Sequence, residues 1–423
     1  MRYIVSDNNF LFKTLFVALI FSLSTFSSVF SLGFYGEHIF LSDLMLFATN
    51  FFLILTEKVK KQPAVLIEYV DQLLLLVLFV LMVIGTFVTL FYRLEGRDIN
   101  DFAFFGGSLF YLLRFLNWWV FFSLLLRKPM GADSWLFVMR AVTAIATILA
   151  VSVIFESLGF YDTIWSSRTT RLIVEGYTGL ISPHEGHAGV VMCCAFFASL
   201  SLAVLEKFRV LTVLPLVLIC TSVILMQRQS ATIALTVGIT FWLFAGVKGR
   251  WLWVSLLICF CLGAVGYSFF SSVSGEELLA NYVSAEGQMT GNLGFRIIAP
   301  LAYLNYMVQE QVSWIYGAGA LSHAMNTSLL GGPHNQYVAI FFEFGILGLV
   351  VLVLAVLRAF FSLSRVPRSG FRYVGAAMLI CFGVYGLASD LFLLTSFGAN
   401  QFVLFILVFS GILSLAGANY GRH

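Results

Sequence analysis

The side chains best suited to chemistry gather where a Gly-Gly-Pro loop runs into a long apolar segment. Residues 331–337 read Gly-Gly-Pro-His-Asn-Gln-Tyr, and the one carboxylate of the apolar segment, Glu343, comes seven residues after Gln336 and is expected on the same helix face. Proline suits a helix entry because it has no backbone N–H to lose, which places His334 and Asn335 at the mouth of a helix. A helix N-terminus favours the neutral imidazole, which can accept a proton as a general base. The alternative is a polar cap that anchors the helix.

Two arginines are candidates for binding an anion. Arg228 lies in a short turn between two apolar runs, and Arg296 is the only lysine or arginine between residues 273 and 333. Guanidinium groups stay charged and bind phosphate oxygens through paired hydrogen bonds, so the two side chains together are suited to a diphosphate. The alternatives are an interfacial arginine for Arg228 and a surface salt bridge for Arg296.

A second long loop, about residues 159–186, carries Arg168 and Arg171. These arginines are candidates for binding an anionic glycan or a lipid phosphate, with interfacial anchoring as the alternative. The His-Glu-Gly-His run at residues 184–187 lies on this predicted loop without a third clear ligand, so we expect loop polarity there. We therefore expect no metal site and no cofactor. All six cysteines lie in apolar runs and are expected to be buried free thiols.

The composition indicates a polytopic membrane protein. The chain has 423 residues, of which 60% are hydrophobic and 11% charged, and its net charge of +3 is too small to indicate nucleic-acid binding. We predict an all-α fold with about twelve transmembrane helices, forming a single membrane domain over residues 1–423. The predicted spans are 11–33, 38–56, 70–92, 103–126, 134–158, 187–205, 208–227, 230–247, 250–272, 335–363, 373–394 and 398–418.

The distribution of basic residues predicts the orientation of these spans. Of the 24 lysines and arginines, sixteen fall in the segments on the side of the N-terminus, six fall on the opposite side and two lie within spans. Basic residues favour the cytoplasmic side, so both termini are expected in the cytoplasm. The loop of residues 273–333, between the ninth and tenth predicted spans, is then periplasmic. Its apolar residues predict a helix from about residue 293 to 310 near the outer membrane surface.

Several polar groups lie in or near the predicted spans. We expect them to be paired buried groups that hold the bundle together, with a transport pathway as the alternative. The Gly-Ala-Gly sequence at residues 317–319 is expected to be a plain turn. The polar groups are Asp71, Arg114, Asn117, Arg140 and Asp390.

Three segments resemble the bacterial O-antigen ligase and O-antigen polymerase superfamily of membrane glycan transferases. They are Gln227-Arg228-Gln229-Ser230-Ala231-Thr232, then Arg296 followed by Trp314-Ile315-Tyr316-Gly317-Ala318-Gly319, and His334-Asn335 with Glu343 and Gly345. The resemblance implies glycan transfer from undecaprenyl diphosphate at the periplasmic face of the inner membrane, without a metal or cofactor. It also implies that Arg228 and Arg296 bind the diphosphate and that His334 activates the acceptor hydroxyl.

The activity expected within this superfamily is that of an O-antigen or exopolysaccharide polymerase. Its partners would be a lipid-linked glycan donor, an acceptor glycan, membrane lipids and a chain-length regulator. Further substrate contacts are assigned to Asn335, Gln336, Glu343, Arg168 and Arg171. The alternatives are an O-antigen ligase that transfers the glycan to lipid A-core, and a lipid-linked oligosaccharide flippase or transporter.

Overall fold

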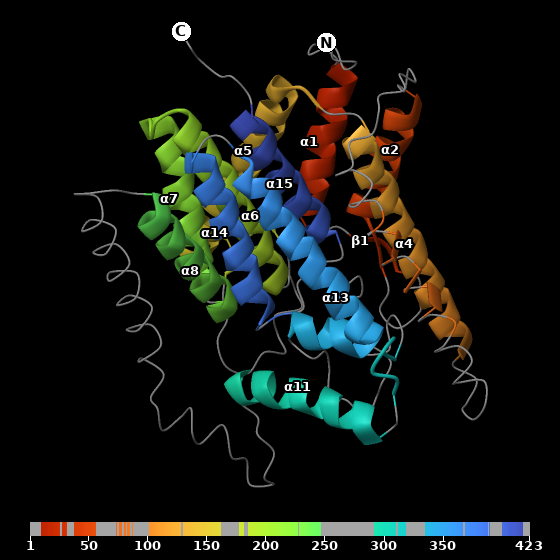
Figure 1. Cartoon of the computed structure of the whole chain (residues 1–423). Coiled ribbons are helices and arrows are strands. Elements are labelled where there is room, and N and C mark those ends of the chain that lie inside the picture. Colours follow the sequence, from red (N-terminus) through yellow and green to blue (C-terminus); the bar gives the residue numbers. More distant parts are fainter. Residues whose placement is uncertain are drawn as a thin grey trace.

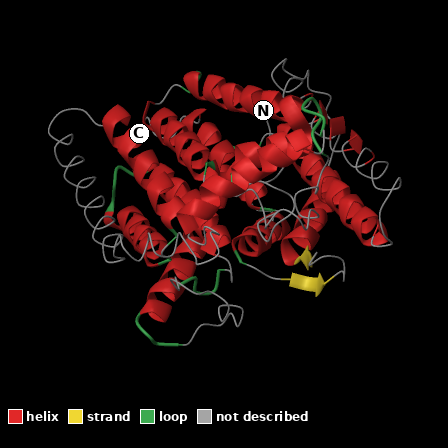
Figure 2. Cartoon of the chain, turned by 90° about the horizontal axis from the view of Figure 1, so that it is seen from below, coloured by secondary structure: helices red, strands yellow, loops and turns green. Residues whose placement is uncertain are grey.

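A computed structural model describes most of the helical segments of the chain. The described residues are 10–25, 28–31, 38–55, 101–127, 130–161, 177–181, 185–226, 228–246, 292–309, 312–318, 335–366, 369–387, 389 and 400–417, with isolated positions between 73 and 87. The helices are α1 (Phe10–Ser24), α2 (Leu41–Leu55), α4 (Asp101–Arg127), α5 (Ala132–Ser157), α6 (Glu185–Leu205), α7 (Val210–Leu225), α8 (Gln229–Gly246), α11 (Asn292–Gln309), α13 (Gln336–Ser364), α14 (Ser369–Gly386) and α15 (Gln401–Gly417). Two short strands, β1 (Ser28–Ser31) and β2 (His38–Phe40), pair antiparallel at the edge of the helices (Figure 2).

Some of the described helices have the length and composition expected of membrane spans. Within the described residues, α5, residues 187–205 of α6, and α13 are long and apolar enough to cross a membrane, and seven other apolar helical stretches are shorter. Every predicted span except 70–92 and 250–272 coincides with a described helix. The isolated described positions of 70–92 are helical, and 250–272 lies outside the described residues. The predicted helical fold is thus confirmed, and twelve spans remain a prediction.

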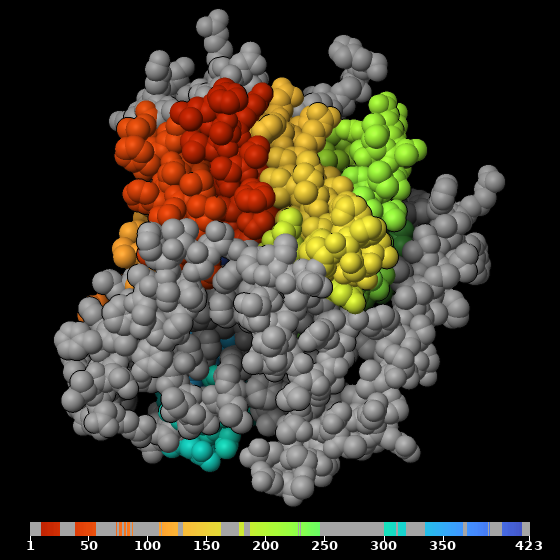
Figure 3. All heavy atoms as spheres, turned by 180° about the vertical axis from the view of Figure 1, so that it is seen from behind, coloured from red at the N-terminus to blue at the C-terminus, as the bar shows by residue number. Residues whose placement is uncertain are grey.

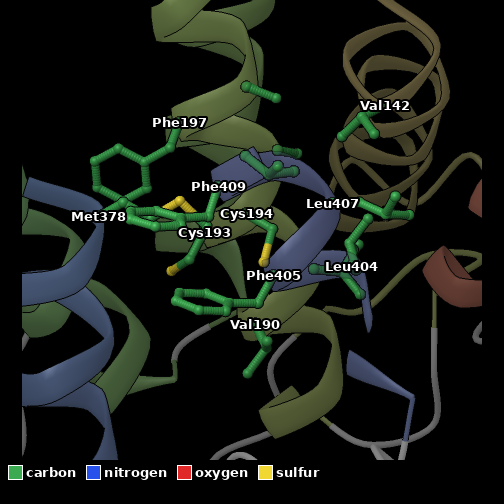
Figure 4. Close-up of a cluster of buried hydrophobic side chains, with 14 of the residues drawn as sticks. Val142, Val190, Cys193, Cys194, Phe197, Met378, Leu404, Phe405, Leu407 and Phe409 are labelled. Carbon is green, nitrogen blue, oxygen red and sulfur yellow. The ribbon is translucent and has the colours of Figure 1, made fainter. Parts of the chain in front are cut away.

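Helix α6 forms the centre of the bundle, with α5, α7, α8, α14 and α15 around it (Figure 1). In the apolar stretch of α6, 89% of the residues are buried inside the protein, whereas the corresponding share in α13 is 33%. Small side chains such as Ala195 and Ala198 let neighbouring helices approach closely. Figure 4 shows Cys193 and Cys194 among side chains of neighbouring helices, including Phe405. All four described cysteines are free thiols, as predicted; Cys259 and Cys261 lie outside the described residues.

The first predicted span, 11–33, is wrong at its C-terminal end. Helix α1 ends at Ser24, and the chain then forms β1. The hydroxyls of Ser22 and Thr25 donate to the carbonyls of Leu19 and Phe21 at 2.8 and 2.9 Å. Such side chains offer backbone groups an alternative to the helical pattern, which favours termination here. The second predicted span also begins too early. Residues 38–40 form strand β2, so the helix starts at Leu41.

Helix α11 lies across one end of the bundle, roughly perpendicular to the other helices (Figure 1). It confirms the predicted helix of about residues 293–310. Seen from behind, it lies below the body formed by α1, α2 and α5 (Figure 3). Its buried side chains Tyr303 and Met307 pack on Phe342 of α13. We call this the α11 end of the bundle; the candidate site lies here.

Candidate anion-binding site

Three helices, α6, α8 and α13, begin at the α11 end of the bundle (Figure 1). Helix N-termini carry partial positive charge and unpaired backbone N–H groups, so a position directly at one of these three N-termini suits an anion. The predicted site residues Arg228, Asn335 and Gln336 lie at two of these N-termini.

Arg228 directly precedes α8. Its carbonyl accepts the N–H and the hydroxyl of Thr232 at 3.1 and 3.2 Å, which fixes the backbone at the first helical turn. The Arg228 side chain is partly buried, and its Nε atom is buried without a hydrogen-bond partner in the described structure. Neither of the two ion pairs among the described residues involves it. An unpaired cation in a poorly hydrated place is costly, so Arg228 is suited to an anionic ligand.

Tyr385 of α14 lies beside Arg228 and is fully buried. It is close enough to the arginine for an electrostatic interaction, and its hydroxyl is near Ser230 of α8. A methyl group added at Gly189 of α6 would come within 2.5 Å of the Tyr385 hydroxyl. This hydroxyl is therefore wedged between α6 and the start of α8. In the sequence, Tyr385 gives no signal beyond that of a tyrosine near one end of an apolar helix.

The mouth of α13 is tied to the end of α14. The Asn335 side chain caps α13 by accepting from the N–H groups of Tyr337 and Val338 at 3.0 and 3.1 Å. Its amide nitrogen donates to the carbonyl of Leu387 at 3.1 Å, and the Tyr337 hydroxyl donates to the carbonyl of Gly383 at 2.8 Å. Both ends of the Asn335 amide are thus used by the fold, which supports the capping alternative for this residue. His334 lies outside the described residues.

Gln336 and Glu343 are both buried, with 4% and 3% of their surfaces exposed. The predicted shared helix face is consistent with this burial. Both side chains lie inside the fold, away from bulk solvent.

Helix α13 fills the predicted span 335–363, but it is kinked at Gly345. Gly345 has φ 62° and ψ −158°, and the two helical pieces on either side point in different directions (Figure 1). The break frees backbone groups that the segment Trp314–Ala318 satisfies. The carbonyl of Phe342 accepts from Ala318 N–H at 2.7 Å, and Ile346 N–H donates to the carbonyl of Trp314 at 2.8 Å.

The described part of the predicted plain turn at residues 317–319 follows a turn at residues 314–316 and also packs against α13. Gly317 has φ 74° and lies against the backbone of Glu343. The Trp314–Ala318 segment therefore belongs to the packing of α13, and Gly319 lies outside the described residues. Hydropathy could not reveal this, because it does not report where the backbone of a distant segment docks.

The remaining predicted site residues are only partly placed. Arg296 lies in the first half of α11, whose backbone is described there without the side chain. Arg168 and Arg171 lie outside the described residues. The chain on either side of them is fastened to α5: Tyr161 donates to the carbonyl of Ser152, and Glu156 accepts from Gly179 N–H at 2.6 Å.

The C-terminal stem of this loop also reaches the turn that carries Arg228. Glu156 accepts a second hydrogen bond from Thr178 N–H at 3.0 Å, and Tyr177 N–H donates to the carbonyl of Leu225 at the end of α7. Glu185 and His187, predicted on a loop, instead lie in the first turn of α6, where His187 is buried. Within the described structure, no three histidine, cysteine or acidic residues are grouped as a metal site requires.

The predicted pairing of buried charges is confirmed for Arg114. Its guanidinium donates to both carboxylate oxygens of Asp43 at 2.9 and 2.8 Å, and Asn400 donates to the same carboxylate at 3.0 Å. Asn117 donates to the backbone carbonyl of Asp43. Arg140 pairs with Glu206, but its side chain is 59% exposed, so the expectation of burial was wrong there.

Asp71 and Asp390, the other two polar groups, lie outside the described residues. Asp43 and Asn400 could not be singled out from the sequence, because their partners are distant along the chain. Arg114 is thus satisfied by the fold, whereas Arg228 has no ion-pair partner among the described residues.

No protein-family model matches the chain, and a search of curated proteins found no significant match. The resemblance to the O-antigen superfamily therefore depends on the three short sequence segments alone.

Proposed function

We propose that this protein is an inner-membrane glycan polymerase that transfers undecaprenyl-diphosphate-linked O-antigen or exopolysaccharide units to an acceptor sugar hydroxyl. The transfer takes place at the α11 end of the bundle, which faces the periplasm. The observation that carries the proposal is Arg228, a partly buried arginine at a helix N-terminus with no acidic partner among the described residues. A diphosphate would supply the missing negative charge.

In the proposed reaction, the acceptor hydroxyl oxygen attacks the anomeric carbon of the donor glycan. The bond from that carbon to the diphosphate oxygen breaks, and undecaprenyl diphosphate leaves with the bonding electron pair. His334 accepts the hydroxyl proton. Arg228 and Arg296 stabilise the charge that develops on the leaving diphosphate, so the reaction needs no metal ion. Attack opposite the leaving group inverts the configuration at the anomeric carbon.

A ligase that transfers the glycan to lipid A-core would use the same chemistry with another acceptor. The polymerase is favoured by the second loop, which carries Arg168 and Arg171. Its described stem is fastened to Leu225, three residues before Arg228. A loop that carries two further arginines, and whose described stem reaches the turn before Arg228, suits an enzyme that holds two anionic lipid-linked substrates.

A flippase or transporter is disfavoured by the way the break in α13 is satisfied. In many transporters, the ends of a broken helix bind substrate or ions near the middle of the membrane. Here the N–H groups of Ile346 and Leu347 donate to carbonyls of the Trp314–Ala318 segment. These donors are therefore occupied by the protein itself.

The proposal is tested with purified protein in lipid vesicles, supplied with radiolabelled undecaprenyl-diphosphate-linked repeat units. The wild-type protein should lengthen the lipid-linked glycan, and EDTA should not stop it. Arg228→Ala should abolish extension, whereas Arg140→Ala, which changes an exposed arginine, should leave it unchanged. An active Arg228→Ala variant, or activity lost in EDTA and restored by Mg²⁺, would contradict the proposal.

The acceptor is identified in a strain that lacks the gene. A lipopolysaccharide gel showing single repeats on core without a ladder indicates a polymerase. Core without O-antigen, together with accumulated lipid-linked polymer, indicates the ligase.

A further inference from the structure

We propose that Gly317 and Gly345 form a backbone lock that positions α11, and with it Arg296, against the mouth of α13. The two glycines are positioning residues, since neither is placed against substrate. The functional part of this inference rests on the proposed glycan transfer. The structural part, the lock itself, can be tested without any assay of transfer.

Both glycines adopt a backbone conformation that other residues rarely take. Gly317 has φ 74° and Gly345 has φ 62°, in the left-handed region where a Cβ atom is disfavoured. The two left-handed turns face each other across one contact. The need for glycine at each position is explained by the close approach of the segment that carries the other glycine.

The contact is closer than any side chain would permit. A Cβ atom added at Gly317 would lie 2.5–2.6 Å from the backbone carbonyls of Glu343 and Phe342. A Cβ atom added at Gly345 would lie 2.4–2.6 Å from the backbone of Ile315 and Trp314. In both cases the obstacle is backbone, which cannot move aside as the end of a flexible side chain can.

Three backbone hydrogen bonds hold the contact together. Ala318 N–H donates to Phe342 at 2.7 Å, while Ile346 and Leu347 donate to Trp314 and Ile315 at 2.8 and 3.2 Å. These are the groups that the break in α13 would otherwise leave unpaired. The Trp314–Ala318 segment therefore completes α13, and the break depends on that segment.

A separate apolar cluster extends the lock to α11. Tyr303 and Met307 of α11 pack with Phe342, and the rings of Tyr303 and Phe342 meet edge to face at 4.8 Å. Trp314 meets Phe341 in the same way at 5.7 Å. Among the described elements, α13 is the one with which α11 makes its main contacts. The position of α11 relative to the bundle is thus set by the first part of α13 and by the lock.

The lock would fix the distance between Arg296 and Arg228, the two arginines that the proposed reaction uses together. Arg296 is carried by α11, and the mouth of α13 is fixed to α14, the helix that brings Tyr385 beside Arg228. Releasing the lock would leave each helix folded but would free α11 to move. Charge stabilisation of a leaving group requires a fixed geometry, so transfer should suffer more than binding.

The lock is tested directly with the pair Ile315→Cys and Leu347→Cys. Both residues are exposed, and their backbones share a hydrogen bond. Under mild oxidation, the pair should form a disulfide, seen as two fewer thiols that react with a polyethylene-glycol maleimide after denaturation. The control pair, Ile315→Cys with Val353→Cys, places the second thiol about 9 Å further along α13 and should stay reduced. An unlinked Ile315–Leu347 pair would overturn the lock.

The role of the glycines is tested with Gly317→Ala, Gly317→Asn and the control Gly159→Ala. Gly159 also has a positive φ, 76°, but nothing lies within 4 Å of an added Cβ atom. Asparagine tolerates positive φ, so Gly317→Asn isolates the close approach from the backbone strain. Both Gly317 variants should lower transfer by about 10–100-fold, whereas Gly159→Ala should not. Full transfer by Gly317→Asn would overturn the positioning role.

Two further measurements separate positioning from loss of folding. Binding of inorganic pyrophosphate, followed by tryptophan fluorescence, should persist in Gly317→Ala, because Arg228 is unaffected. The Ile315–Leu347 disulfide, introduced into Gly317→Ala, should restore part of the transfer. If Gly317→Ala does not fold, the cross-linked protein with both glycines intact should retain transfer, and its inactivity would contradict the proposed geometry. Absence of transfer in the wild-type protein would refute the proposed function but not the disulfide result.

Discussion

Arg228 and Arg114 show how the surroundings of a residue decide its role. Arg114 is almost fully buried, yet Asp43 neutralises its charge through two hydrogen bonds. Arg228 is less buried and has no acidic partner among the described residues. Because burial of an unpaired charge costs several kcal/mol, Asp43 accounts for the burial of Arg114, and we propose an anionic ligand as the partner of Arg228.

At this scale, the geometry of the guanidinium can be tested with Arg228→Lys. Lysine keeps the charge but offers a point charge in place of a planar pair of donors, so transfer should fall by about 10-fold or more. Arg140→Lys is the matched control and should retain wild-type activity, because that side chain is largely exposed. Full activity of Arg228→Lys in the vesicle assay would show that shaped recognition of the diphosphate is not needed.

His334 is the second residue whose chemistry can be tested alone. A positioned general base contributes about 10²–10⁴-fold, so His334→Ala should lose transfer by that factor while still binding the lipid-linked donor. Transfer by the wild-type protein should fall below about pH 6, because the protonated imidazole can no longer accept a proton. His334→Asn keeps a polar side chain beside the Asn335 cap but supplies no base; an active His334→Asn variant would remove the histidine from the mechanism.

At the scale of elements, α13 is two helices joined by a residue that is not helical. Its first part is capped by Asn335, tied to α14 through Tyr337 and completed by the Trp314–Ala318 segment. Its second part runs from Ile346 to Ser364 and exposes apolar side chains such as Val353 and Leu357. The exposed apolar surface of the second part is suited to contact with lipid. The first part is mostly buried against other segments and contributes to the candidate site.

The cap of α13 gives a prediction for this element. Asn335→Ala removes the acceptor for two backbone N–H groups and should lower the free energy of unfolding by about 1 kcal/mol. Asn335→Asp keeps the acceptor and should recover most of that loss, although it cannot donate to the carbonyl of Leu387. Thermal unfolding in detergent, followed by circular dichroism, measures both. Equal stability of Asn335→Ala and the wild-type protein would mean that the cap is not formed.

At the scale of the whole molecule, helices distant in sequence are joined by one buried polar network. Asp43 of α2, Arg114 of α4 and Asn400 at the start of α15 meet in it, and Trp118 donates to Asn400 at 2.7 Å. The network connects the first helices of the chain to the last. Since these hydrogen bonds join side chains of different helices, the network helps to specify how the helices pack.

Removing one member of this network should destabilise the whole bundle. Arg114→Leu leaves the Asp43 carboxylate without its cation and should cost about 3–5 kcal/mol. The double variant Asp43→Leu with Arg114→Leu should cost less than the sum of the two single variants, since no charge is left alone. Arg140→Leu, which breaks the exposed pair, should change stability by only about 0.5 kcal/mol. Additive single effects would show that the pair is not coupled.

The orientation of the molecule is tested by labelling a cysteine placed at Ser284. The excess of basic residues on the side of the N-terminus predicts that residues 273–333 are periplasmic. A thiol reagent that does not cross the membrane should therefore label Ser284→Cys in intact spheroplasts. Ser364→Cys, at the opposite end of α13, should react only after permeabilisation. Labelling of Ser284→Cys from the cytoplasm alone would refute the proposed site.

The sequence by itself determined the properties that depend on composition and short-range pattern. Apolar runs determined where most helices lie, the apolar residues after Leu293 predicted α11, and the loop composition located Arg228 at the start of α8. These predictions succeed because helix formation and burial in lipid depend on neighbouring residues along the chain.

Only the tertiary structure decided which backbone and polar groups satisfy one another. Hydropathy could not predict the break at Gly345, because its stability depends on hydrogen bonds from Trp314–Ala318, about thirty residues earlier. It could not pair Arg114 with Asp43, because a carboxylate 71 positions away reaches it only when α2 and α4 pack together. In each case the structure is stabilised by a hydrogen bond to a buried polar group that would be costly to leave unpaired. The tertiary fold determines which group supplies that hydrogen bond.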